Sequence, residues 1–491
     1  MNLLEYLTLI FLVLSQNAKG DCEDESCKEI PSNHTLMCSY ANCNFIPKTQ
    51  PGRLLKFIDF SHNKITEITQ VLHYQVAISI DLSFNNIKNI KNGVFFYCLH
   101  LQTLHIAHNN LTFLTPGVFN GLNNVRYLFL QSNYLQSLQS SQFNPEFLTN
   151  LRTLDLSFNK IYTINETSFS GLGLLTTLHI HHNKITGEYF NNVCFKDLTS
   201  LITLDASNNY IEFIGSGSIN KSANLVSLNL SQNSINSMAS DVFFGMDSLA
   251  YLRLDWNLIS HLEPGTFNLK SLEELDLSFN HFNDIKPEYF QNCTARKLIL
   301  QNITSLKALR NNSFSSYARL ERLHISKNPK LSEIEAGAFG GRVALRDIYL
   351  DTNALETLKQ DTLDFASAEN VDLSQNPWRC DKDIAWMASE HIKWINKHNM
   401  RCASPAHLKG MQISKLNPED FDPPTIEGRR IAIGVLICSA ILIFAIVLAV
   451  LWRYRDRILS HQSTTRYRSL YDVNEDDVTF RHSRESRPLP L

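Results

Sequence analysis

The chain has 491 residues, a formal net charge of −3 and a charged fraction of 19%. No block of basic residues precedes residue 429, so the charge pattern gives no reason to expect nucleic acid as a partner. The motifs HExxH, GxSxG, GxGxxG and the P-loop are absent from the sequence. We therefore expect neither an enzyme nor a bound cofactor or metal ion.

The first predicted element is an apolar segment at residues 7–14, which reads LTLIFLVL and precedes a small-x-small pattern at 18–20. Eight helical residues span roughly 12 Å, which is shorter than the hydrocarbon core of a bilayer, about 30 Å. The segment therefore predicts a signal peptide over residues 1–20 and not a membrane anchor.

A single frame, LxxLxLxxNxL, then recurs through residues 55–376. It reads LRTLDLSFNKI from Leu151 and LTTLHIHHNKI from Leu175, and its asparagine returns every 22 to 26 residues. Ile303 stands in the asparagine position of one degenerate unit. The frame asparagines are Asn63, Asn85, Asn109, Asn133, Asn159, Asn183, Asn209, Asn233, Asn257, Asn280, Asn328, Asn353 and Asn376.

This period and pattern resemble those of leucine-rich repeats, with about 14 units. The resemblance implies an α/β-type solenoid, a horseshoe with a parallel β-sheet on its concave face. The leucines would fill a core that no single repeat can close, and the asparagine amides would form a ladder between repeats. Phenylalanines at a later frame position are expected in the convex-side core: Phe119, Phe169, Phe195, Phe243, Phe267, Phe290, Phe314 and Phe339.

Six of the ten cysteines lie at the two ends of the repeats. The N-terminal cap, residues 21–54, contains Cys22, Cys27, Cys38 and Cys43. A signal peptide implies an oxidising compartment, so we expect two disulfides there, with three possible connectivities.

The C-terminal cap, residues 377–422, reads NPWRCDKDIAWMASEHIKWI before Cys402. It resembles the cysteine-flanked cap of extracellular leucine-rich-repeat proteins, Toll-type ectodomains and Slit-like proteins among them. That cap usually has four cysteines; here Cys380 and Cys402 match the first and third, Lys382 stands at the second, and none follows Phe421. The resemblance implies one retained bridge, Cys380–Cys402.

The other four cysteines are interpreted as thiols. Cys98 and Cys293 follow the convex phenylalanine position, where a buried, inert thiol is expected. The environment of Cys194 is left open, and Cys438 is expected to pack within a membrane helix.

Eight N-x-S/T sequons predict N-glycosylation. Asn229 is the one that falls on a concave-face strand, where a glycan would obstruct the middle of that face. The sequons are at Asn33, Asn110, Asn165, Asn220, Asn229, Asn292, Asn302 and Asn311.

Residues 431–452 form an uncharged apolar segment of roughly 33 Å in helical form, long enough to span a bilayer. A linker, residues 423–430, precedes it, and Arg453, Arg455 and Arg457 follow it. This basic excess predicts a type I plasma-membrane protein with an extracellular N-terminus.

The tail, residues 453–491, is too short for the TIR domain of Toll-type receptors and is expected to be disordered. Tyr467 and Leu470 fit a Yxx(apolar) sorting motif.

The side chains that alternate with the strand leucines are the candidate ligand contacts. The first group is His105, Tyr127, Phe129, Gln131, Asp155, His179 and His181. The second group is Tyr251, Arg253, Asp255 and Trp256. The recurring strand aspartates are interpreted as part of the repeat pattern. The histidines near 105 and near 179 lie three repeats apart, roughly 15 Å, too far to share a metal ion.

Two functions remain open at this stage. The first is a receptor or co-receptor whose ectodomain binds an extracellular protein and signals through a partner. The alternative is a cell-adhesion molecule that binds a membrane protein on a neighbouring cell, as the resemblance to Tartan-, Capricious-, Connectin- and Chaoptin-like proteins implies. The ligand, the oligomeric state, the glycan occupancy and any signalling by the tail are left undetermined.

Overall fold

The computed structural model describes residues 27–47, 54–140, 142–144, 146–219, 222–317, 319–340, 344–422 and 426–465. Its internal contacts divide the chain into two units, Met1–Phe421 and Asp422–Leu491. The signal peptide, Cys22, Asn220 and the sorting motif at Tyr467 and Leu470 lie outside the described residues.

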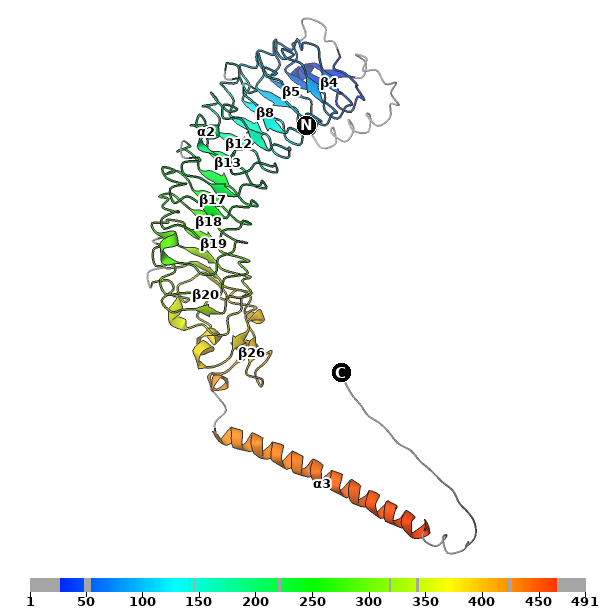
Figure 1. Cartoon of the computed structure of the whole chain (residues 1–491), viewed down its shortest axis with the longest axis vertical. Helices are drawn as coiled ribbons and strands as arrows, with labels where there is room; N and C mark the ends of the chain where they lie inside the picture. The colour runs from blue at the N-terminus through cyan, green and yellow to red at the C-terminus, as the bar shows by residue number, and fades with distance from the viewer. Residues whose placement is uncertain are drawn as a thin grey trace, which may run out of the picture. The chain divides into compact units, whose positions relative to one another are not determined.

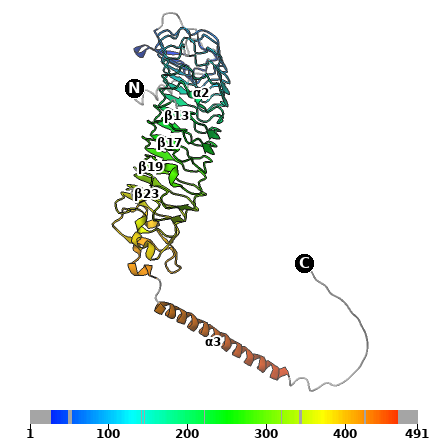
Figure 2. The same ribbon diagram turned by 60° about the vertical axis from the view of Figure 1, so that its left-hand side comes forward.

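The first unit is a curved stack of repeats with one continuous sheet along its length (Figures 1 and 2), which confirms the predicted parallel-sheet solenoid. In the described part of the chain this sheet has sixteen strands, and only its first pair, β1 (Lys28–Ile30) and β2 (Thr35–Met37), is antiparallel. The repeat strands that follow are β3 (Phe57–Asp59), β5 (Ser79–Asp81), β7 (Thr103–His105), β8 (Tyr127–Phe129), β10 (Thr153–Asp155), β12 (Thr177–His179), β13 (Thr203–Asp205), β15 (Ser227–Asn229), β17 (Tyr251–Arg253), β18 (Glu274–Asp276), β19 (Lys297–Ile299), β21 (Arg322–His324), β23 (Asp347–Tyr349) and β24 (Asn370–Asp372).

Short elements form the turns and the caps. Two-residue strands pair beyond the main sheet as β4 (Glu67–Ile68) with β6 (Asn89–Ile90), β9 (Ser137–Leu138) with β11 (Thr163–Ile164), β14 (Phe213–Ile214) with β16 (Ser237–Met238), and β20 (Ala308–Leu309) with β22 (Glu333–Ile334). The helical turns are η2 (Pro31–Asn33), α2 (Asn192–Phe195), η3 (Pro287–Phe290), η4 (Gln360–Thr362), η5 (Lys382–Ala388), η6 (Lys397–Asn399), η7 (Ile413–Lys415) and η8 (Pro418–Phe421).

Each repeat strand buries its central residue, while the residues on either side of it are half-buried or exposed, apart from the buried Asp372 in β24. In β8, Leu128 is fully buried, whereas Tyr127 is exposed and Phe129 is half-buried. Successive side chains of a strand point to opposite faces. The frame leucines therefore form the core, and the residues between them form the concave face, by which we mean the solvent side of the sixteen-stranded sheet.

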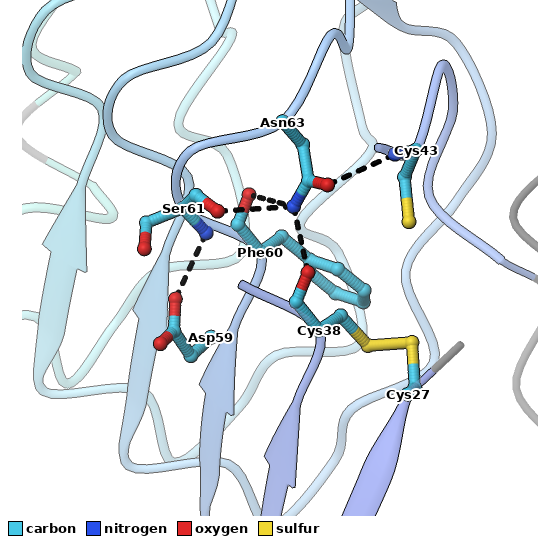
Figure 3. Close-up of a disulfide and its surroundings, with 7 residues drawn as sticks. All are labelled: Cys27, Cys38, Cys43, Asp59, Phe60, Ser61 and Asn63. Atoms are coloured by element: carbon cyan, nitrogen blue, oxygen red, sulfur yellow. Dashed lines mark hydrogen bonds between the residues drawn. A yellow bond between two sulfur atoms is a disulfide. The ribbon is translucent and has the colours of Figure 1, made fainter. Parts of the chain in front are cut away.

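The frame asparagines form the expected ladder, and Figure 3 shows its first member. Asn63 accepts a hydrogen bond from the backbone N–H of Cys43 at 2.9 Å and donates to the carbonyls of Cys38 and Phe60 at 2.7 and 3.0 Å. One amide thus satisfies backbone groups of two adjacent turns. Where Ile303 replaces the asparagine, it is buried, and its own N–H donates to the side-chain oxygen of Asn328 at 2.7 Å.

The phenylalanines predicted on the convex side are all buried and stack in two columns. Phe143, which the prediction omitted, completes the first column between Phe119 and Phe169, with ring centroids 6.1 and 6.3 Å apart. It follows its frame asparagine, Asn133, at the same offset at which Phe119 and Phe169 follow theirs, so the repeat pattern did indicate this position.

The residue before each frame asparagine has a left-handed backbone, with φ between 52° and 60°. These residues lie beside the sheet, and several of their rings stack on those of the next repeat. Tyr40 stacks on His62, His62 on Phe84 and Phe84 on His108, with centroids 4.2 to 4.3 Å apart. We call this row the flank ladder.

Both caps contain a disulfide. Cys27 is bonded to Cys38 in the N-terminal cap (Figure 3), and Cys43 is also disulfide-bonded. The Cys380–Cys402 bridge implied by the family resemblance is present. It joins β25 (Trp378–Arg379) to β26 (Cys402–Ser404) above the last repeat, where the buried Trp378 indole donates to the carbonyl of Leu373 at 3.0 Å. The caps therefore cover both ends of the core.

Cys98, Cys194 and Cys293 are buried thiols and are not bonded to another cysteine in the described part of the chain. Burial raises the pKa of Cys98 to about 12 and that of Cys194 and Cys293 to about 11. The expectation that Cys98 and Cys293 are buried thiols is confirmed, Cys194 is buried as well, and the inertness of these thiols stays a prediction.

The second unit contains one long helix, α3 (Ile426–Thr465). Its segment Ile433–Arg455 has a mean hydropathy of 3.1 and is the single candidate membrane span among the described residues. The apolar segment predicted at 431–452 lies within α3, and the helix already begins inside the segment that the sequence assigned to a linker. Cys438 is exposed on α3.

Candidate protein-binding site on the concave face

The concave face consists of two rows of side chains, because parallel strands pair frame position with frame position. The first row, before each central leucine, includes Thr103, Tyr127, Thr153, Thr177, Thr203, Ser227 and Tyr251. The second row, after it, includes His105, Phe129, Asp155, His179, Asp205, Asn229 and Arg253. Residues at equal frame positions are therefore direct neighbours.

The second-row aspartates hold the turn that follows their strand. Asp155 accepts hydrogen bonds from the N–H of Ser157 at 2.9 Å and from its hydroxyl at 2.6 Å. Asp205 and Ser207 repeat this contact at 3.0 and 2.7 Å. Asp155 thus has a local structural role, which agrees with the interpretation of these aspartates as part of the pattern.

An aromatic cluster lies on β7 and β8. Tyr127 is 41% exposed, and the ring of Phe129 stacks on that of His105 with centroids 4.5 Å apart and planes 7° apart. Burial lowers the pKa of His105, while nearby Asp81 opposes that shift, so the imidazole is mostly neutral at physiological pH. Gln131 adds a buried side-chain oxygen to which no described residue hydrogen-bonds. We call Tyr127, Phe129 and His105 the aromatic patch.

The second expected group is divided by the structure. Tyr251 is 49% exposed in the first row, and Arg253 lies beside it in the second, 3.3 Å from the carboxylate of Asp255. Trp256 is 52% exposed but belongs to the flank ladder, where it stacks on Phe279 at 3.9 Å.

Asp255 does not present its carboxylate for contact, contrary to its place in the expected group. It is only 6% exposed, because its frame position follows the strand and turns toward the core edge. Burial, followed by the nearby Asp276, raises its pKa, while Arg253 opposes the shift.

Asn229 lies in the second row, as its frame position predicted. Its amide nitrogen donates to Oδ2 of Asp205 at 3.2 Å, and its oxygen accepts from the N–H of Ser231 at 3.1 Å. A glycan at this position would stand over β13 to β17, and its presence stays a prediction.

A third group combines residues from two neighbouring repeats. His179 and Asp205 are paired in the second row, and His181 follows His179 by two residues. One potential ligand atom from each lies within 4.8 Å of the others. The expectation of no metal site rests on histidines alone and leaves out Asp205, although its frame position, equal to that of His179, was available as a signal.

A shallow depression of about 450 Å³ interrupts the flank ladder where the small Ser132 separates His108 from Phe158. Its rim includes Lys160, whose ammonium lies 4.4 Å from the ring centroid of Tyr134, and the sequon residue Asn110. A glycan at Asn110 would occupy this depression, and its presence stays a prediction.

The comparisons with known proteins agree with this architecture. The family model described as a leucine rich repeat matches residues 79–135, 128–185, 149–211 and 199–259. The model of the BspA type leucine rich repeat region matches residues 260–382. Together they span well over half of the chain. The chain belongs to the leucine-rich-repeat proteins.

Two curated relatives show how far the sequence likeness of this leucine-rich-repeat protein extends. Trophoblast glycoprotein of Macaca fascicularis is 26% identical, over 46% of this chain and 69% of that protein. Chondroadherin of Rattus norvegicus is 32% identical, over 21% of this chain and 28% of that protein. The chain thus spans little more than a quarter of chondroadherin.

Two solved structures share the fold. The LRIM1/APL1C complex matches with a TM-score of 0.56 and 20% identity, over 86% of this chain and 76% of that chain. The APL1 leucine-rich repeat domain matches with a TM-score of 0.52 and 23% identity, over 67% of this chain and 82% of that chain. At these identities the likeness concerns the fold.

Proposed function

We propose that this protein is a cell-surface receptor or co-receptor whose concave face binds an extracellular protein and which signals through partners. The observation that carries the proposal is the aromatic patch, in which exposed Tyr127 lies beside the stacked rings of Phe129 and His105. Aromatic side chains are enriched at the energetic centres of protein interfaces. The solved LRIM1/APL1C complex, in which a protein of this fold assembles with another protein, supports a protein as the ligand.

The proposed orientation in the membrane is deduced from the positive charges that follow the apolar segment of α3. Residues 1–20 would be removed as a signal peptide, residues 55–376 with their caps at 21–54 and 377–422 would lie outside the cell, and residues 431–452 would span the membrane. Arg453, Arg455 and Arg457 follow the apolar segment, and positive charge is retained on the cytoplasmic side. Residues 453–491 would form the cytoplasmic tail.

The first test uses cells that display the full chain. Exposure to secreted proteins from tissue, followed by crosslinking and mass spectrometry, should recover a soluble protein ligand. The adhesion alternative uses the same face but a membrane-bound partner. If the displaying cells aggregate and no soluble ligand is recovered, the adhesion role replaces the receptor role.

The second test concerns the aromatic patch. The double substitution Tyr127→Ala and Phe129→Ala should weaken ligand binding by more than about 2 kcal/mol, the usual scale of an interface hot spot. Tyr162 and Phe213 provide a matched control, because both are exposed and lie outside the sixteen-stranded sheet. Alanine at both control positions should leave affinity unchanged, and an equal affinity for both double variants would place the binding site elsewhere.

A further inference from the structure

The repeat that contains β12 departs from its neighbours at two positions. In the repeats on either side, the second row carries an aspartate and the residue two places later is a serine: Asp155 with Ser157, and Asp205 with Ser207. The β12 repeat has histidine at both places, His179 and His181. The turn-holding pair is thus replaced by two imidazoles on the concave face.

The strand register brings a carboxylate to these imidazoles. Asp205 is the direct partner of His179 across β12 and β13, and potential ligand atoms of His179, His181 and Asp205 lie within 4.8 Å of one another. All three side chains are half-buried. They are therefore accessible from solvent and partly fixed by their neighbours.

Each of the two histidines offers one ring nitrogen for coordination. Nδ1 of His179 is buried, and no described residue hydrogen-bonds to it. Nδ1 of His181 lies 2.9 Å from Nδ1 of His182. When Nδ1 of His181 is the donor in this hydrogen bond, the ring is oriented and Nε2 keeps its lone pair for a metal ion, as in metal-bound histidines that donate their other ring N–H.

The carboxylate is held by its own neighbours. Oδ1 of Asp205 accepts hydrogen bonds from the N–H and hydroxyl of Ser207, and Oδ2 accepts from the amide of Asn229 at 3.2 Å. Hydrogen bonds of this kind around a ligand carboxylate fix its orientation toward the metal. Asn229 would then be an outer partner of the site in addition to being a sequon residue.

We propose that His179, His181 and Asp205 bind a divalent transition-metal ion, with Zn²⁺ as the fitting species. Two imidazoles and one carboxylate suit Zn²⁺, whereas Ca²⁺ and Mg²⁺ prefer oxygen ligands. Tetrahedral Zn²⁺ with bonds of about 2.0–2.2 Å needs ligand atoms roughly 3.4 Å apart. Rotation of the three side chains would have to bring their ligand atoms, now within 4.8 Å of one another, to that spacing, and a fourth position would then face the solvent.

The site goes beyond the proposed function, because it depends on neither the identity nor the existence of a protein ligand. A carboxylate or imidazole of a bound protein could occupy the open coordination position of the metal ion on this face. Zn²⁺ would then strengthen binding of such a ligand, but the metal site itself is tested without it.

The test is a titration of the metal-free full chain, in detergent, with Zn²⁺ in a calorimeter. We expect one ion per chain and, with Co²⁺ in its place, the visible absorption of a tetrahedral site. The double substitution His179→Asp and His181→Ser restores the Asp-x-Ser pattern of the neighbouring repeats and should preserve the fold while weakening Zn²⁺ binding at least tenfold. Asp205→Asn keeps the acceptor for Ser207 and should weaken binding as well.

The β7 repeat provides the matched control, because it has His105 where Asp is usual and Ala107 where Ser is usual. The double substitution His105→Asp and Ala107→Ser makes the same kind of change three strands away from β12 in the sheet, and it should leave Zn²⁺ binding intact. Equal Zn²⁺ affinity in the wild type and in the His179→Asp/His181→Ser variant would overturn the proposal. If that variant does not fold, unchanged affinity in Asp205→Asn would overturn it instead.

Discussion

One buried asparagine in each regular repeat links the backbones of adjacent turns. Asn159 accepts from the N–H of Leu135 at 3.0 Å and donates to the carbonyls of Leu130 and Leu156, both at 3.1 Å. Backbone groups buried in this way have no access to water, so they need these partners. The frame asparagine is therefore needed because it supplies the hydrogen-bond partners of these buried backbone groups.

Asn159→Ala should lower the free energy of unfolding by about 1–3 kcal/mol, because it leaves buried backbone groups unsatisfied. Chemical denaturation of the full chain, followed by fluorescence, measures this change. Asn150 is the control: its amide also bridges two repeats, donating to the carbonyl of Asn123 at 2.8 Å, but it is exposed. Comparable losses for Asn150→Ala and Asn159→Ala would contradict the role of burial.

The buried thiols give a second prediction for single residues. Burial raises the pKa of Cys98 to about 12, and only the thiolate reacts with alkylating reagents. In the folded protein at about pH 8, Cys98 should stay unmodified by iodoacetamide and become modified in denaturant. Peptide mass spectrometry distinguishes the two states. Rapid alkylation of Cys98 without denaturant would show that this part of the core opens.

The packing of the convex side depends on the two columns of phenylalanine rings. Phe169 is fully buried between Phe143 and Phe195, with centroids 6.3 and 6.1 Å away. No regular helix covers these turns among the described residues 142–144 and 146–191. The packed rings, together with the frame leucines, therefore fill the space between one turn and the next.

Phe169→Ala should destabilise the protein by about 3–5 kcal/mol, through lost burial and the cavity left between two neighbouring rings. Phe213→Ala, at a ring that is exposed, should change stability by no more than about 0.5 kcal/mol. Thermal unfolding of both variants measures the difference. A shift of similar size in the two would show that the column does not stabilise the repeats.

The sequence predicts most of this architecture, because a repeat imposes the same chemistry at the same position many times. The ladder and the convex rings could be identified in this way, whereas the Cys380–Cys402 bridge was implied by the resemblance of its cap to that of extracellular leucine-rich-repeat proteins. Phe143 could have been identified as well, since it follows its frame asparagine at the same offset as Phe169. The burial of Asp255 was missed because the frame does not say where the chain turns after its strand.

The candidate sites were less predictable than the fold. The residues of the aromatic patch could be predicted from their frame positions alone. The structure adds that Phe129 and His105 stack and so form one surface. The three-residue group at β12 needed cross-strand register, because Asp205 lies 26 residues after His179. The candidate sites on this face combine residues that are paired across neighbouring strands. Comparing residues in sequence order alone does not reveal such pairs.

At the scale of the whole molecule, buried histidines on the concave face should make stability depend on pH. Burial lowers the pKa of His324 below its ordinary value of 6.5, as do Lys297 and Arg322, while Asp347 and Glu274 oppose the shift. The folded state therefore favours neutral imidazole, and the unfolded chain binds its proton first as the pH falls. The stability contributed by this neutral histidine is fully present above the unfolded pKa and is lost as the pH falls through the folded pKa.

We accordingly expect the melting temperature of the full chain to fall between about pH 7.5 and about pH 5.5, before most carboxylates titrate. His324→Phe retains a ring to stack on Tyr349, whose centroid lies 4.4 Å away, and removes the titration. It should reduce the fall, whereas His407→Phe, at an exposed cap position, should not. An identical fall in His324→Phe and the wild type would mean that other groups determine acid stability. A reduced fall would identify a concave-face histidine as a group through which mildly acidic compartments loosen the solenoid.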